Sequence, residues 1–168
     1  MKKTGIFYSF NTHKTAQVSK KIVELWGDTI DEINVEKATD EQLMSYENYI
    51  LGVPTWFDGE LPNYWDELVP ALNDMDFTGK TVAIFGNGDQ IKYGENFGDG
   101  VGIMGEIIES RGGKIIGFTS IEGYEFEQSR AKRDNQFVGL LLDFENQARK
   151  NNERIKNWVT QIKKDMNT

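Results

Sequence analysis

The sequence of 168 residues contains no cysteine and a single histidine, His13. Without cysteine the chain can form no disulfide, no thiolate nucleophile and no cysteine-ligated zinc or iron–sulfur site. One imidazole also excludes a metal site that needs two histidines. Redox or group-transfer chemistry would therefore depend on a bound cofactor or on oxygen and nitrogen side chains. The lack of cysteine suits a reducing compartment, so we expect a cytoplasmic location.

Basic residues and long hydrophobic runs are scarce as well. The chain has 19 Lys and Arg residues against 27 Asp and Glu residues, and the net charge of -8 opposes binding to a nucleic-acid backbone. The first apolar run, residues 5–8, is too short for a signal peptide or a membrane span. We therefore expect neither nucleic acid nor a membrane as a partner. The length predicts a single domain over residues 1–168.

Short apolar runs alternate with stretches of helical periodicity, which is the pattern of strand–helix units on a parallel sheet. The five expected strands cover residues 3–8, 29–35, 49–53, 81–85 and 114–120. We expect five helices. The first covers residues 15–26 and ends at Gly27, the second begins at a capping box of Thr39 and Gln42, and the third is bracketed by Pro62 and Pro70. The fourth ends at Gly112 and Gly113, and the C-terminal helix is capped by Asn151 or Asn152.

One segment breaks this alternation. Residues 121–136 are polar, and three acidic residues in them are followed by Arg130, Lys132 and Arg133, before the apolar run of residues 137–142. We interpret the segment as an insertion into the last strand. Its basic cluster is short and lies beside acidic residues, which favours a solvated loop over a partner site.

In an open α/β sheet, ligands bind beyond the carboxyl ends of the strands. The first loop at that edge contains Ser9, Phe10, Asn11, Thr12, His13, Lys14 and Thr15 and leads directly into a helix. Backbone N–H groups and hydroxyls at a helix N-terminus suit a phosphate, although the same residue types also cap helices that bind nothing. Both interpretations stay open. The glycines that a Walker A loop or a G-x-G-x-x-G turn requires are missing.

Two further loops bring aromatic rings to the same edge. The second loop contains Pro54, Thr55, Trp56, Phe57, Asp58 and Gly59, and the third contains Asn87, Gly88, Asp89, Tyr93, Asn96 and Phe97. Either ring alone would more often be a packing residue, but an aromatic ring in such a loop can also stack on a planar ligand. A phosphate loop together with two such rings indicates a phosphorylated, planar, conjugated ligand. Flavin mononucleotide (FMN) meets all of these requirements.

At these residues the chain resembles the long-chain flavodoxins. The similarity covers almost the whole sequence and is carried by residues 5–8, 54–56, 59–61, 88–90, 93, 96–97, 111–114, 123–124 and 137–139. The resemblance implies a flavodoxin-like three-layer α/β sandwich with helices on both faces. Its five-stranded parallel sheet would have the order 2-1-3-4-5, of which flavodoxin is itself a standard example, with the last strand interrupted by an insertion.

The resemblance also implies a function and the roles of the two rings. Trp56 and Tyr93 would lie on opposite faces of the isoalloxazine, with Asn87, Gly88 and Asp89 along it. The implied function is one-electron transfer at low potential by non-covalently bound FMN, with no catalytic side chain and no metal. Aromatic walls exclude water and nearby carboxylates repel added charge, so the anion left by full reduction is disfavoured.

The phosphate loop departs from the family pattern, which reads roughly T/S-x-T-G-x-T. Thr12 and Thr15 would hold the phosphate, but Phe10 and His13 replace the first hydroxyl residue and the glycine. The lost hydroxyl removes about one hydrogen bond, roughly 1.5–3 kcal/mol to a charged group, and a positive φ at His13 would cost about 1–2 kcal/mol. His13 or Lys14 could offer a cation instead. We therefore expect FMN to bind with changed affinity.

The resemblance bears on two other positions. In flavodoxins a peptide carbonyl in the second loop turns toward the flavin and favours its protonated, one-electron-reduced state, and here that carbonyl belongs to Phe57, before Asp58. Members often carry Gly or Asn there, which adopt left-handed conformations cheaply, so we expect less of that state. Glu145 or Asn146 would lie near the ribityl chain, although a solvated loop explains these residues nearly as well.

Two rival functions remain open. An FMN-dependent NAD(P)H quinone reductase of the same fold would need an open flavin face, whereas Trp56 and Tyr93 would cover both faces. A binding module that has lost its cofactor would explain the altered phosphate loop. For an electron carrier, the acidic surface predicts basic redox partner proteins, a reductase and an electron acceptor, and transfer that slows as salt rises. We expect the carrier to be a monomer.

Overall fold

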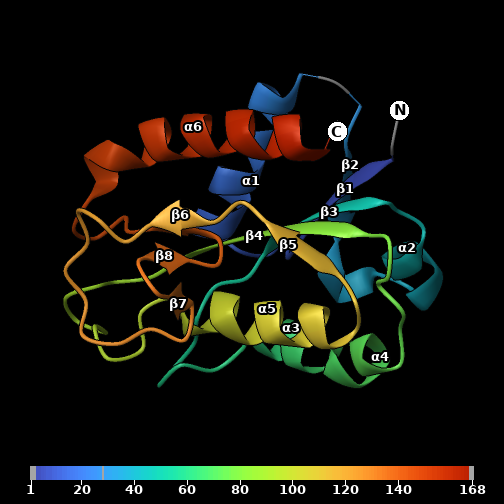
Figure 1. The fold of residues 1–168 in the computed structure, drawn as a ribbon, viewed down its shortest axis with the longest axis horizontal. Coiled ribbons are helices and arrows are strands. Elements are labelled where there is room, and N and C mark those ends of the chain that lie inside the picture. Colours follow the sequence, from blue (N-terminus) through green and yellow to red (C-terminus); the bar gives the residue numbers. More distant parts are fainter. Residues whose placement is uncertain (1–2, 28, 167–168) are drawn as a thin grey trace.

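The computed structural model describes residues 3–27 and 29–166 (Figure 1). The elements in chain order are β1 (Thr4–Tyr8), α1 (Lys14–Trp26), β2 (Asp31–Asn34), the 3-10 helix η1 (Val35–Lys37), α2 (Asp40–Met44), β3 (Asn48–Gly52), α3 (Asn63–Asp66), α4 (Val69–Asn73), β4 (Thr81–Asn87), α5 (Asp99–Ser110), β5 (Lys114–Ile116), β6 (Thr119–Ser120), β7 (Lys132–Arg133), β8 (Gln136–Phe137), β9 (Leu140–Leu142) and α6 (Ala148–Met166). Of the helices in this part of the chain, none combines the length and hydrophobicity needed to cross a bilayer.

The central sheet is parallel and has the strand order β2-β1-β3-β4-β5, with β9 paired to β4 as well. The expected order 2-1-3-4-5 is therefore confirmed. Helices α1 and α6 cover one face of the sheet, and α3, α4 and α5 lie on the other, which gives three layers (Figure 1). Because both faces are covered, the strand ends are the places where polar loops meet solvent.

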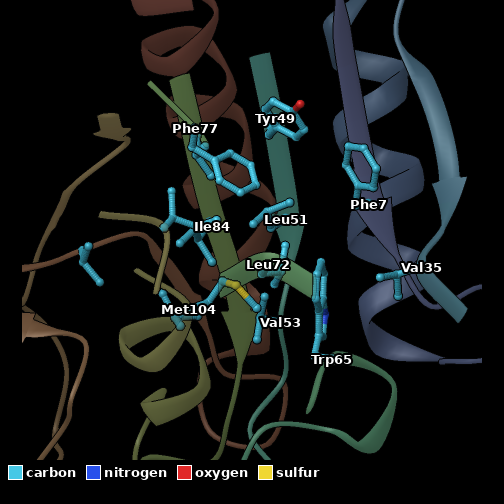
Figure 2. Packing of buried hydrophobic residues seen from close by; sticks show 14 of the residues in the cluster. Phe7, Val35, Tyr49, Leu51, Val53, Trp65, Leu72, Phe77, Ile84 and Met104 are labelled. Atoms are coloured by element: carbon cyan, nitrogen blue, oxygen red, sulfur yellow. The ribbon is translucent and has the colours of Figure 1, made fainter. Parts of the chain in front are cut away.

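Alternate residues of the central strands enter two separate apolar cores. On β1, Phe7 belongs to the core under α3–α5, whereas Ile6 packs in the core under α1 and α6. On β4 the same alternation places Ile84 in the core under α3–α5, which we call the first core, and Phe85 in the core under α1 and α6, the second core. The period of two residues in a strand requires this alternation. Figure 2 shows part of the first core, in which Leu51 and Val53 lie near Trp65 and Leu72. Tyr49 packs between Phe7 and Phe77, with 5.5 and 5.7 Å between the ring centroids.

Residues 117–139 leave the sheet between the two halves of its last strand. β5 pairs with the first half of β4, and β9 pairs with the second half. Between them, β6, β8 and β7 form a separate antiparallel sheet. The insertion is confirmed, but the expected strand 114–120 is too long. Gly117 has a φ of 84° and turns the chain out of the sheet, and Thr119–Ser120 pairs with β8 instead.

Several helix ends lie where the sequence predicts them. Gly27 ends α1 with a φ of 73°. Thr39 and Gln42 form both hydrogen bonds of a capping box at the start of α2. Gly112 follows α5 with a φ of 88°. At each of these positions the local residue type alone determines where the helix begins or ends.

Two expected helix boundaries are wrong. Pro70 lies in the first turn of α4, where a missing N–H costs nothing, so residues 63–73 contain two short helices instead of one helix that ends at a proline. The C-terminal helix begins at Ala148, so neither Asn151 nor Asn152 caps it. Asn151 is instead buried within the helix.

The basic residues of the insertion bind α5. Arg130 lies 3.1 Å from the carboxylate of Glu106, and Arg133 donates a hydrogen bond of 2.9 Å to Glu109. Both pairs lie at the surface, where Arg130 is exposed and Arg133 partly exposed, so they agree with the solvated loop that we expected. The carboxylates on the exposed side of α5 neutralise them and hold the insertion against the helix.

The close approach of the insertion to α5 predicts opposite outcomes for two glycine substitutions in that helix. A Cβ at Gly102 would lie 2.3 Å from the backbone of Arg130, whereas a Cβ at Gly105 would lie 3.3 Å from the side chain of Val138. Alanine is favoured over glycine in a helix by about 1 kcal/mol, but overpacking costs roughly 1–3 kcal/mol. We expect Gly102→Ala to lower the free energy of unfolding in urea by about 1–2 kcal/mol, and Gly105→Ala to leave it unchanged or raise it. Equal effects would contradict this packing.

Candidate functional site

Three loops meet at the carboxyl edge of the sheet, after β1, β3 and β4. A cavity of about 390 Å³ lies between the second and third loops, and another of about 400 Å³ reaches the first turn of α1. Both cavities are lined by Thr55, Gly88, Asp89 and Tyr93. They therefore form one continuous site that extends from the second loop to the first helix.

The structure brings many of the predicted site residues together in this site. Its lining includes Lys14, Thr55, Trp56, Phe57, Asn87, Gly88, Asp89, Tyr93, Asn96, Phe97 and Glu145, together with Lys92, Gly98 and Phe144, which the sequence analysis missed. The other predicted residues are not among the described residues that line these two cavities: Ser9, Phe10, Asn11, Thr12, His13, Thr15, Pro54, Asp58 and Gly59. These belong to the first and second loops, which border the site.

Trp56 and Tyr93 approach the site from different loops. Trp56 is partly buried, and its ring meets that of Tyr64 edge-on, with 5.8 Å between the centroids and 90° between the planes. Tyr93 is half exposed. Since the edge-on contact supports Trp56 while Tyr93 faces solvent, the two rings can border a planar ligand without filling the space between them.

The second loop is a tight turn with strain at its tip. Two backbone hydrogen bonds of 2.8 and 2.7 Å join Trp56 and Glu60, so residues 57–59 form the tip. Phe57 has a φ of 51° and its side chain is 73% exposed. A left-handed conformation costs a non-glycine residue roughly 1–2 kcal/mol, and an exposed ring recovers little of that by packing. The left-handed backbone of Phe57 therefore supports the expectation that glycine or asparagine would fit better at this position.

The first turn of α1 offers backbone donors to an anion. His13 precedes the helix, and no side chain of the described residues caps the first turn. The N–H groups of Lys14, Thr15 and Ala16 have no partner within the helix, and the first turn contains no acidic residue. These donors and the helix dipole attract a negative group. The hydroxyl of Thr15 extends toward the third loop and contacts the Asn87 amide oxygen at 3.2 Å.

Polar side chains of the first loop bind Glu36 of η1. The hydroxyl of Ser9 donates to the Glu36 carboxylate, and the Asn11 amide donates to the same oxygen at 3.0 Å. These hydrogen bonds lower the pKa of Glu36. Ser9 and Asn11 therefore fix the shape of the loop, because their donors are already in use.

The structure shows the conformation of His13 and the contacts of Lys14 and Phe10, the unusual residues of this loop. His13 has a φ of −97°, so the cost that a positive φ would impose does not arise. Lys14 pairs with Glu145, which lies across the second cavity. The charge of Lys14 is thus largely balanced before any ligand binds. Phe10 packs on Tyr8 with 5.0 Å between the ring centroids and remains half exposed.

A buried carboxylate that the sequence analysis missed holds the third loop. Asp143 follows β9 and accepts hydrogen bonds from the backbone and side chain of Gln90 at 3.1 and 2.8 Å, and from the backbone and side chain of Asn146 at 2.9 Å each. Burial alone would raise the pKa of Asp143, but the hydrogen bonds from Asn146 and Gln90 outweigh it, so the pKa is lowered. The sequence signal that could have predicted this role is an acidic residue directly after a buried strand, at the carboxyl edge of the sheet.

Asp89 is a second ionised carboxylate, and it lines the site itself. Burial would raise its pKa, but hydrogen bonds from the Lys92 backbone, the Asn146 side chain and the Ile91 backbone outweigh that effect and lower it. The Asn146 amide lies 2.7 Å from Asp89 and also donates to Asp143. Asn146 therefore joins the loop after β9 to the third loop.

The insertion supports the third loop from the other side. The carbonyl of Gly94 accepts hydrogen bonds from the N–H groups of Glu127 and Gln128 at 2.8 and 2.9 Å. The side-chain oxygen of Gln90 accepts from the N–H of Glu125. Tyr93 is thus carried by a loop whose backbone is fixed to two distant segments. No group of three or more metal-ligating side chains lies together in the described part of the chain.

Comparison with known proteins shows the family. The flavodoxin family model matches residues 6–158. The chain belongs to the flavodoxin family. It is 45% identical over 167 residues to a flavodoxin of Nostoc sp., which covers 98% of this chain and 97% of that protein. It is 41% identical over 165 residues to flavodoxin 1 of Escherichia coli, covering 97% and 94% of the two chains.

The fold is also that of a flavodoxin. It matches the crystal structure of Fusobacterium nucleatum flavodoxin bound to FMN with a TM-score of 0.93 and 37% identity, covering 98% of this chain and 99% of that chain. The resemblance to long-chain flavodoxins is confirmed, since the matches extend over nearly the full length and the last strand is interrupted.

Replacing Asp143 tests the network under the third loop. Asp143→Asn keeps the shape but loses the charge, and its amide nitrogen cannot accept a hydrogen bond from Gln90 or Asn146. We expect the free energy of unfolding at neutral pH to fall by roughly 2–3 kcal/mol. The depressed pKa of Asp143 contributes stability that is complete above the ordinary carboxyl value of about 3.9 and is lost as pH falls through the lower folded value.

Urea denaturation at several pH values measures this contribution. The difference between wild type and Asp143→Asn should be constant from neutral pH down to about pH 5 and shrink below about pH 4. Asp134→Asn serves as the control, because Asp134 is exposed and its φ of 54° suits asparagine. A constant difference at every pH would show that the charge of Asp143 contributes nothing.

Proposed function

We propose that this chain carries single electrons at low potential on a non-covalently bound FMN, with the isoalloxazine between Trp56 and Tyr93. The observation that supports this proposal is the continuous site. It has these two rings at one end and reaches the uncapped first turn of α1 at the other. Its shape and donors fit a planar ring joined to a phosphate. FMN supplies the redox chemistry when bound, and the chain supplies binding, exclusion of water and the local charge.

The phosphate would be held mainly by backbone. The N–H groups of Lys14, Thr15 and Ala16 provide donors. The hydroxyl of Thr12, which here donates to the Ser9 carbonyl at 2.7 Å, would turn to donate to the phosphate. Ser9 and Asn11 would act indirectly, by fixing the loop to Glu36. This arrangement explains how the loop could bind phosphate without the hydroxyl that Phe10 replaces.

The low potential would come from the charges around the ring. Asp89 is ionised and lines the site, while Asp58 and Glu95 lie exposed in the second and third loops. A negative field beside the ring disfavours the addition of further negative charge. We propose that Asp89 contributes most, because it lies nearest to the site and its pKa is lowered.

The partners of this carrier would be basic redox proteins, a reductase and an electron acceptor. Flavodoxins pass electrons to redox partners, and the net charge of -8 would steer this chain toward positive surfaces. We further propose that it acts as a monomer of one domain in the cytoplasm. The lack of cysteine supports the location, and the length of the chain supports a single domain.

The quinone reductase is the weaker candidate. Flavodoxins are electron-transfer proteins, and the relatives described above are flavodoxins. Such a reductase would also need one ring face free for its substrates, whereas Trp56 and Tyr93 both line the proposed ring site. NADPH consumption by the FMN-loaded protein without a partner would distinguish the two functions.

The proposal predicts strong preference for FMN over riboflavin. Titration of the apoprotein, followed by quenching of flavin fluorescence, should show FMN binding at least about 100-fold more tightly, because two or more charge-assisted hydrogen bonds to the phosphate are lost with riboflavin. Thr12→Val should weaken FMN and leave riboflavin unchanged. Equal affinities for the two flavins would overturn the phosphate assignment, and no binding of either would favour a module without cofactor.

Phe57 provides a test of the second loop. Rotation of the peptide between Phe57 and Asp58 changes the backbone angles of both residues, and glycine at position 57 lowers the cost of that change. We expect Phe57→Gly to widen the separation between the two one-electron midpoint potentials by up to about 90–170 mV, because roughly 1–2 kcal/mol of strain shifts each potential by about 40–90 mV in opposite directions. Redox titration measures it. Phe57→Leu keeps the strain and should leave the separation unchanged, so equal effects would refute the role of φ.

A further inference from the structure

Among the described residues, the ring of Trp56 has one exposed aromatic neighbour and one buried one. Its contact with Phe57 is edge-on, with 6.3 Å between the centroids, but Phe57 is exposed at the strained tip of the second loop. Its contact with Tyr64 is also edge-on, at 5.8 Å, and Tyr64 is buried in α3. Edge-on pairs are favourable because the positive edge of one ring meets the negative face of the other. Tyr64 is therefore the neighbour that can hold the orientation of Trp56.

The position of Tyr64 is set by α3 and not by the tip of the second loop. The indole N–H of Trp65, the next residue in α3, donates to the carbonyl of Gly52, where β3 ends, at 2.9 Å. The backbone N–H of Trp65 donates to the carbonyl of Pro62 at 3.0 Å. These hydrogen bonds join the short helix to the end of a central strand. Movement of residues 57–59 therefore need not move Tyr64.

The ring of Tyr64, and not its hydroxyl, makes the contact with Trp56. The hydroxyl oxygen is buried and has no hydrogen-bond partner within residues 3–27 and 29–166. Burial raises the pKa of Tyr64, and the carboxylate of Glu36 adds to this effect, so the side chain stays neutral at physiological pH. A buried hydroxyl without a partner lowers stability. Removing the hydroxyl should therefore leave the ring in place.

We propose that Tyr64 is a positioning residue for the flavin, because it holds the indole of Trp56 in the orientation that stacks on the isoalloxazine. This inference rests on the proposed function, which places Trp56 on one face of the ring. A side chain that is held before its ligand arrives loses less conformational freedom on binding, and the affinity is higher for that reason. Since the contribution concerns the ring of the flavin and not its phosphate, it should be equal for FMN and riboflavin.

Substitutions at Tyr64 separate the ring from the hydroxyl. In titrations of the apoprotein, Tyr64→Leu should bind FMN and riboflavin each roughly three- to tenfold more weakly, since an edge-on aromatic pair contributes a comparable energy. Tyr64→Phe retains the ring and should bind both flavins as the wild type does. The visible circular dichroism of bound FMN depends on the rings packed against the flavin. It should change in Tyr64→Leu and not in Tyr64→Phe.

Phe77→Leu is the control for a general loss of packing. Phe77 is buried in the first core and meets Tyr49 at 5.7 Å, with 69° between the ring planes. Figure 2 shows this pair at the end of the core away from Trp65. Phe77→Leu should lower the thermal midpoint, as Tyr64→Leu does, but it should leave both flavin affinities and the visible circular dichroism unchanged.

Three results would overturn the inference and leave the proposed function intact. They are unchanged affinities in Tyr64→Leu, equal losses in Tyr64→Phe or Phe77→Leu, and a loss in Tyr64→Leu that is confined to FMN. A wild-type protein that binds neither flavin would overturn both proposals. Tyr64→Met, whose flexible side chain fills irregular space, gives the same comparison if Tyr64→Leu fails to fold.

Discussion

The buried charge of Asp143 is the interaction on which the third loop depends. It lies where β9 ends, and it binds the backbone and side chain of Gln90 in one segment and of Asn146 in another. Gln90 in turn accepts from Glu125 of the insertion. Three segments that are distant in sequence thus meet around one carboxylate. Tyr93 depends on that junction as well as on its neighbours in the loop, because its N–H donates to the Asp89 carbonyl at 2.9 Å.

The two sides of the site are built differently. The third loop is fixed by the Asp143 network and by the insertion, whereas the tip of the second loop is joined at its base by two hydrogen bonds between Trp56 and Glu60. Phe57 at that tip is exposed and strained. The third loop is thus the rigid side of the site and the tip of the second loop is the adjustable side. This suits a site whose ligand changes charge, because only the second loop has to reorganise.

Local sequence signals were sufficient for much of the architecture. Capping residues and glycines marked several helix ends, and alternating apolar residues marked the strands that the two cores bury. The features that escaped prediction depend on long-range contacts. Nothing in the local sequence shows that Asp143 collects donors from Gln90, that Glu36 holds the first loop, or that Asn151 lies inside a helix instead of at its start. The resemblance to flavodoxins predicted the strand order and indicated which loops face one another, which periodicity alone does not determine.

The divided last strand has a consequence for how freely the chain can vary. β5 ends opposite Ala83 and β9 begins opposite Phe85, so one residue of β4, Ile84, separates the two pairings. A single amino acid in place of residues 117–139 could in principle bridge that gap without altering the register on either side. The insertion is therefore not needed for the topology of the sheet. A family with this fold can lengthen, shorten or lose it and keep the same arrangement of strands.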